Sequence, residues 1–128
     1  MRLYKLKAFA RFQRRERISD TTLCTAVSDA EAGLIEADLG GGLIKQRVAR
    51  PGAGKRGGYR TVIAYRKGAR AFFLLGFAKS ARANIDDDEL AALKRRAAGL
   101  LAAADQALDE MIADEDLTEV DCGESTQD

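Results

Sequence analysis

The chain has 128 residues, of which 46% are hydrophobic, and this suits one globular domain with one core. It has no histidine, which excludes Ser-His-Asp triads, Cys-His pairs and HExxH zinc sites. The net charge of +1 hides an asymmetry: residues 1–82 carry 18 Lys and Arg against 6 Asp and Glu, and residues 83–128 carry 3 against 14. A body this basic points to a polyanionic partner, above all nucleic acid.

The cysteines and the N-terminal segment indicate a cytoplasmic protein. Cys24 and Cys122 are far apart and form neither a CxxC site nor a disulfide framework, so we expect two reduced thiols. The basic N-terminal segment lacks the apolar region and cleavage site of a signal peptide. No apolar run approaches the roughly 18 residues of a membrane span, so we expect no membrane partner.

The first half of the chain is predicted to form a short strand and two helices. The strand covers residues 3–5, and a helix follows from residue 6 to about residue 17, where apolar positions recur at helical spacing. Ser19 is a good N-cap for a second helix, which Gly33 ends at the usual position after the last turn.

Three strands are predicted after the glycine run at residues 40–42. In LIKQRVA (residues 43–49) the period changes to two, so Ile44, Gln46 and Val48 face one way while Lys45 and Arg47 face the other. The segments YRTVIAYR (59–66) and RAFFLLGFA (70–78) are rich in β-branched, aromatic and other apolar residues. Because the connections are short, we expect an antiparallel meander.

The C-terminal third is predicted to form one long helix over residues 86–113. Asp86 and Glu89 resemble a capping box, and a single apolar stripe indicates packing on the sheet or on a partner. We place the domain at residues 1–113 and expect residues 114–128 to be an acidic, flexible tail. This tail could fold over the basic face of the protein or serve only as a solubilising segment.

The glycine-rich stretch at residues 52–57 formally matches GxGxxG. A dinucleotide-binding loop needs a helix after the glycines, but here a strand follows. A phosphate-binding P-loop is also excluded, because Ala49 and Arg56 stand where Gly and Ser or Thr are required around Lys55. What remains is a basic hairpin loop, and composition alone leaves it open whether the loop grips a phosphate or is a solvated tip.

Cations around this loop favour an RNA-binding surface. A three-strand meander can bring them to one face or edge, where tyrosines could stack on bases, although the alternation of Tyr59 and Tyr65 with Ile63 favours the core for them. The predicted RNA-binding residues are Lys45, Arg47, Arg50, Lys55, Arg56 and Tyr59.

Residues 38–85 resemble the RelE/ParE superfamily of bacterial toxins, specifically its HigB-like branch. The matching features are a Gly-Gly-Leu before a basic strand, the loop Gly-Lys-Arg-Gly-Gly, and a hairpin that ends in Phe-Ala-Lys-Ser-x-Arg. The resemblance implies an α+β, RelE-like fold. In it two N-terminal helices pack on a small twisted antiparallel sheet whose open face is basic, and a long C-terminal helix follows.

The resemblance implies a ribosome-dependent mRNA endoribonuclease that needs no metal or cofactor and is neutralised by a cognate antitoxin, usually a helix-turn-helix protein. In such a reaction an mRNA 2′-OH attacks the adjacent phosphate, and cations stabilise the developing charge. The positions that match the family's catalytic cations are Arg60 and Arg82, for charge stabilisation, and Lys79, as base or acid. Some members have a catalytic tyrosine near the C-terminus, but no tyrosine follows Arg82 here, which leaves the general base open.

Two other functions remain open from the sequence. Some members of the superfamily bind and poison DNA gyrase without cutting RNA. The chain could also be a basic RNA-binding protein without catalytic activity.

Overall fold

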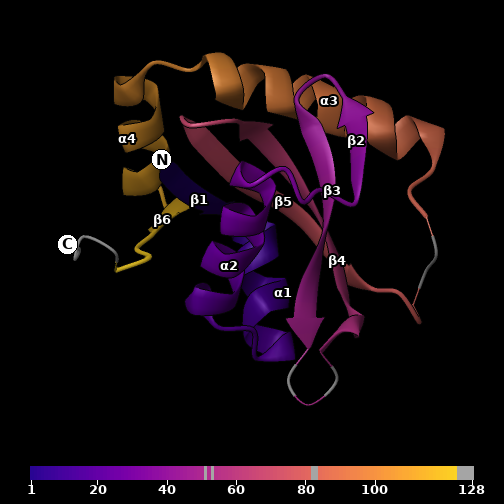
Figure 1. Cartoon of the computed structure of the whole chain (residues 1–128). Helices are drawn as coiled ribbons and strands as arrows, with labels where there is room; N and C mark the ends of the chain where they lie inside the picture. Colours follow the sequence, from indigo (N-terminus) through magenta and orange to yellow (C-terminus); the bar gives the residue numbers. More distant parts are fainter. Residues whose placement is uncertain (51, 53, 82–83, 124–128) are drawn as a thin grey trace.

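A computed structural model describes residues 1–50, 52, 54–81 and 84–123, with only the backbone for residues 54–57. The described chain is built from a mixed sheet with helices on both faces (Figure 1). The elements are β1 (Arg2–Leu6), α1 (Lys7–Glu16), α2 (Asp20–Glu31), β2 (Ala37–Gly40), β3 (Leu43–Arg50), β4 (Gly54–Arg66), β5 (Arg70–Ala78), α3 (Asp87–Ala102), α4 (Asp105–Ala113) and β6 (Leu117–Val120).

The predicted α+β class is confirmed, but the sheet is larger than expected and not wholly antiparallel. Its strand order is β2-β3-β4-β5-β1-β6. The meander of β3, β4 and β5 is antiparallel, as predicted, whereas β1 pairs with β5 in parallel. The two edge strands, β2 and β6, were not predicted.

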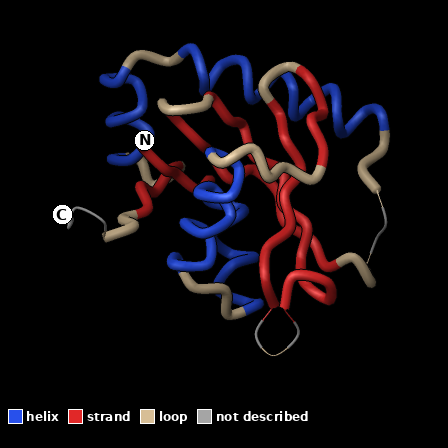
Figure 2. Tube along the Cα trace, in the orientation of Figure 1, coloured by secondary structure: helices blue, strands red, loops and turns tan. Residues whose placement is uncertain are grey.

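Strand alternation divides the core into two clusters, one on each face of the sheet. Ile44, Ile63 and Phe73 point to one face, where they pack with apolar residues of α1 and α2. Leu43, Val62 and Phe72 point to the other, where they pack with residues of α3 and α4. Figure 2 shows the strands running between these helices.

The second face of the sheet is therefore partly covered, although the resemblance implied an open basic face. At one end of the sheet α3 lies close against the β2–β3 turn, since a Cβ added to Gly42 would lie 2.6 Å from Leu101 Cδ1. Gly42 also has a φ of +84°, which side chains rarely adopt. In Figure 1 α3 crosses the hairpin of β3 and β4 near one end, and the hairpin continues beyond this helix.

The helix starts agree with the predicted caps. The Ser19 hydroxyl accepts a hydrogen bond from the Thr22 N–H at 3.1 Å, and the Asp86 carboxylate accepts one from the Glu89 N–H at 2.8 Å. Each contact satisfies an N–H that has no partner within its helix.

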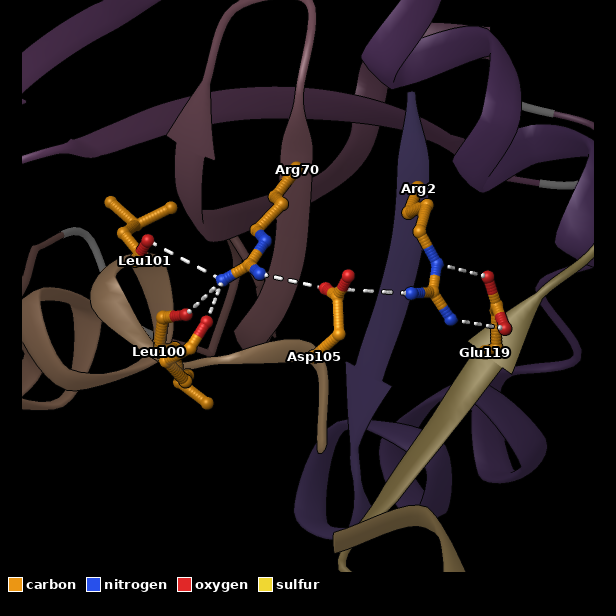
Figure 3. Close-up of polar contacts among 7 residues, drawn as sticks. Arg2, Arg70, Leu100, Leu101, Asp105 and Glu119 are labelled. Atoms are coloured by element: carbon orange, nitrogen blue, oxygen red, sulfur yellow. Dashed lines mark hydrogen bonds and ion pairs between the residues drawn. The ribbon is translucent and has the colours of Figure 1, made fainter. Parts of the chain in front are cut away.

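The long C-terminal helix was predicted as one element, but it is broken at Ala103 and Ala104, which are extended. Arg70, at the start of β5, stabilises the break (Figure 3). Its Nη1 donates to the carbonyls of Leu100 at 3.2 Å and Ala103 at 2.6 Å, which terminates α3. The break redirects the chain so that α4 can pack on the sheet through a buried leucine, Leu108.

Asp105, the first residue of α4, joins this junction to the N-terminal strand. It accepts a hydrogen bond from Arg70 Nη2 at 3.0 Å and lies 3.7 Å from Arg2 Nη1. Arg2 in turn donates two hydrogen bonds to Glu119 of β6, at 3.0 and 3.1 Å. Figure 3 shows the resulting chain of alternating charges across β5, β1 and β6.

The segment predicted as a flexible tail contributes a strand. β6 pairs antiparallel with β1, and its Leu117 and Val120 are buried. Because β6 lies at the opposite edge of the sheet from β2 and β3, residues 114–123 do not fold over the basic strands. Residues 124–128 lie outside the described part of the chain.

Cys24 and Cys122 form a disulfide in the structure, so the prediction of two reduced thiols is wrong. Their Cα atoms are 5.7 Å apart although they are separated by 98 positions in the sequence. The pairing of β6 with β1 brings Cys122 next to α2, and only the tertiary fold creates this proximity.

Candidate nucleic-acid interface

The hairpin of β3 and β4 carries the predicted basic residues on two different faces. Because Ile44 and Val48 point toward α1 and α2, Lys45 and Arg47 point to the opposite face, as the sequence predicted. Arg60 lies directly opposite Arg47 in the register of the two strands. Arg47 is exposed, Lys45 is half-buried, and Arg60 is only 5% exposed.

Arg47 and Arg60 share one carboxylate, that of Glu36. Glu36 Oε2 accepts a hydrogen bond from Arg60 Nε at 3.0 Å and one from Arg47 Nε at 3.4 Å. Two guanidinium groups that converge on one carboxylate form a charge-assisted cluster with the geometry of an anion site. Glu36 was not among the predicted site residues, because it lies just before β2, a strand that was not predicted either.

The two arginines differ in how deeply their side chains are buried. The Arg60 side chain is 6% exposed and that of Arg47 is 46% exposed. In this conformation Arg60 cannot touch an external phosphate directly, which differs from the surface position that its predicted role assumed. A pocket of about 250 Å³, lined by Asp29, Glu36, Gln46 and Arg47, opens beside the cluster.

Tyr59 belongs to the core and does not offer a ring for base stacking, which corrects its predicted role. It is 2% exposed and lies edge-on against Phe12, with the ring centroids 5.4 Å apart. Its hydroxyl donates to Glu16 Oε1 at 2.8 Å. Burial, and then this hydrogen bond, raise the pKa of Tyr59 above its usual value.

Arg50 lies on the α1 side of the hairpin, away from Arg47 and Arg60. Its guanidinium carbon is 5.6 Å from the centroid of the Tyr59 ring, a cation–π contact. Arg50 is exposed, so it remains able to contact a phosphate. The structure thus brings together only part of the predicted basic cluster.

Lys79 is exposed and directly follows β5. The preceding residue, Ala78, is paired with Tyr59, which places Lys79 at the same end of the hairpin as Arg60. Lys55 and Arg56 lie on β4, but their side chains are outside the described atoms. Arg82 lies outside the described residues.

Further cations on α1, and one at its C-cap, were not among the predicted site residues. They lie on the exposed surface of a helix whose buried side, Phe9 and Phe12, packs on the sheet. Their helical spacing next to an apolar stripe is the signal that could have identified them. These exposed residues are Lys7, Arg11, Arg14, Arg15 and Arg17.

A larger pocket, of about 1060 Å³, lies away from the basic hairpin, where α2 meets β1 and β6. Its lining includes Cys24, Cys122 and three carboxylates, those of Glu31, Glu119 and Asp121. It therefore has neither the position nor the charge expected of a phosphate site.

The described residues offer neither a metal-binding cluster nor a membrane span. No group of three or more His, Cys, Asp or Glu side chains within them could hold a metal ion. Across the same residues, no helix combines the length and the apolar character needed to cross a membrane.

Comparison with known proteins assigns the chain to a family. A family model described as "RelE toxin of RelE / RelB toxin-antitoxin system" matches residues 1–120. The match spans every helix and strand described above, β6 included. No curated protein matches the chain.

Proposed function

Since the chain belongs to the RelE family of toxins from toxin–antitoxin systems, we propose that it is a ribosome-dependent mRNA endoribonuclease of the HigB-like branch. The observation that supports this most is the family match together with the cations that the β3–β4 hairpin presents. The proposed reaction is attack by an mRNA 2′-OH on the adjacent phosphate, which forms a 2′,3′-cyclic phosphate and expels the 5′-oxygen, and the protein acts in the cytoplasm.

In this proposal the cations have different roles in catalysis and in RNA binding. Lys79, exposed at the end of β5, transfers a proton as base or acid, and Arg82 stabilises the charge that develops on the phosphate. Arg60 stabilises the same charge once it leaves its contact with Glu36. The remaining cations of the hairpin hold the RNA backbone by charge. They are Lys45, Arg47, Arg50, Lys55 and Arg56.

The family implies a cognate antitoxin as partner. We propose that it is a helix-turn-helix protein, as the HigB-like branch suggests. Co-expression of such a protein from the neighbouring gene is expected to restore growth. The co-expressed protein should also co-purify with the toxin. Growth arrest that persists despite that protein would oppose this assignment.

The activity is tested by inducing expression of the protein briefly in bacteria and then mapping the 5′ ends of cellular RNA. We expect new ends within translated messages and none when initiation of translation is blocked. Lys79→Met should lower the yield of these ends by about a hundredfold, since a positioned acid or base contributes 10²–10⁴-fold. Lys67→Met, which alters an exposed lysine in the turn before β5, is the matched control and should cut like the wild type.

The outcomes distinguish the alternative functions. Growth arrest with intact messages and signs of DNA damage would support a gyrase-binding toxin instead. RNA binding with steep salt dependence but without growth arrest would support a non-catalytic RNA-binding protein.

A further inference from the structure

Glu36 occupies the point where two arginines converge, and its carboxylate is the anion that they bind in the free protein. Arg47 and Arg60 come from facing positions of β3 and β4, and both direct Nε to the same oxygen, at 3.4 and 3.0 Å. An internal carboxylate held in this way resembles a bound phosphate, because guanidinium groups bind both kinds of oxyanion with the same geometry.

The cluster is incompletely satisfied. Arg60 Nη1 and Glu36 Oε1 are both buried, and within the described part of the chain neither has a hydrogen-bond partner. A buried polar atom that lacks a hydrogen bond is costly even when its group is paired through another atom, and such atoms occur at sites that bind or react. The 250 Å³ pocket opens beside Glu36 and Arg47 of this cluster, and Asp29 and Gln46 complete its lining.

We propose that Glu36 is an internal substitute for a phosphodiester of single-stranded RNA, and that the RNA phosphate displaces its carboxylate from Arg47 and Arg60 on binding. A phosphodiester offers two anionic oxygens, so it can engage Nε of one arginine and the unpaired Nη1 of the other. The exchange makes and breaks only hydrogen bonds and ion pairs. This inference rests on the proposed function for the identity of the ligand and adds Glu36 as the residue that sets the affinity.

The test is a Glu36→Gln variant, which keeps the size of the side chain and removes its charge. RNA binding is measured by fluorescence anisotropy with a labelled single-stranded RNA at several salt concentrations. Freed from the carboxylate, the two arginines should bind RNA about tenfold more tightly. The slope of log K against log salt should steepen by about 0.7 for each arginine that gains a phosphate.

Asp38→Asn is the matched control. It removes one negative charge two residues away, at an exposed position whose side chain accepts a hydrogen bond from the Gly40 N–H at 2.9 Å, a contact that asparagine can keep. It reports the general effect of net charge on RNA binding. The proposal is overturned if Glu36→Gln binds RNA no more tightly than Asp38→Asn does, or with the same salt slope.

Two further measurements keep the result decisive. If Glu36→Gln does not fold, as judged by circular dichroism, Glu36→Asp replaces it. The shorter side chain of aspartate should loosen the contact with Arg60 and also tighten RNA binding, and unchanged binding would overturn the proposal.

If no variant binds RNA, the proposed function fails, and inorganic phosphate then tests the exchange alone. In that case phosphate should raise the melting temperature of Glu36→Gln more than that of Asp38→Asn, and equal shifts would overturn the exchange as well.

Discussion

The disulfide between Cys24 and Cys122 should account for a large share of the stability of the oxidised protein. The bond links positions 98 apart in the sequence. Closing a loop of that size in the unfolded chain lowers its entropy by an amount equivalent to about 4.7 kcal/mol at 25 °C. Domains of this size have unfolding free energies of about 5–15 kcal/mol, so its loss should be easily measured.

The assay compares the oxidised wild type with the double variant Cys24→Ser/Cys122→Ser in urea, followed by circular dichroism. With an m value of at most about 3 kcal/mol/M, the midpoint of the variant should fall by at least about 1.6 M. A reductant should lower the wild-type midpoint equally and leave the variant unchanged, which is the control. In a compartment that keeps thiols reduced, the protein would lack this contribution to its stability.

Two results would refute this reasoning. Two reactive thiols in wild-type protein that was oxidised and then denatured without reductant would show that the bond does not form. The second result is a wild type whose disulfide is demonstrated by mass spectrometry but whose urea midpoint equals that of the double variant. It would show that loop closure does not determine the stability.

Two further predictions concern other parts of the fold. Arg70→Met should lower the unfolding free energy by about 2–3 kcal/mol, because α3 loses the charged donor at its last carbonyls; Arg66→Met, at the exposed partner position on β4, should cost far less in the same urea titration. Hydrogen bonds from the Tyr65 hydroxyl and the Gly68 N–H lower the pKa of Glu31, so its stabilising effect is complete above pH 4.5 and is lost as the pH falls through the lowered pKa. Tyr65→Phe should therefore lose less stability than the wild type between pH 5 and pH 3, and equal losses would contradict the role of this contact.

The elements that the sequence predicted well are those with strong local signals. The central strands have alternating or wholly apolar patterns, and the helix starts carry Ser19 and Asp86 as caps. These signals act over a few residues, so they are visible without the fold.

The edge strands lack such a pattern. β2 has only four residues, ADLG. β6 also has four, LTEV, of which only the first and the last are buried. Leu117 and Val120 are three positions apart and surrounded by acidic residues, and this spacing is typical of a helix rather than of a strand. β6 forms because β1 offers it an edge, and the two segments are more than a hundred residues apart.

The candidate site also depends on contacts between residues that are distant in the sequence. The sequence identified Arg47 and Arg60 as cations of one hairpin, and the register confirms that they face each other. It could not show that Arg60 is buried, because the counter-charge, Glu36, comes from a segment 24 positions earlier. The break between α3 and α4 was missed for a similar reason, since the donor that ends α3 is Arg70 on β5.

The position of β1 in the sheet has a consequence for how the protein is made. This strand is synthesised before the other five strands of the sheet, yet its two neighbours are β5 and β6. At about 5–20 residues per second, roughly 3–13 s pass before residues 70–73 follow it, and about 2–9 s more before residues 117–120 do. A ribosome that is making this protein therefore carries a molecule whose first strand still lacks both partners, and the complete sheet exists only after the last strand has left the exit tunnel.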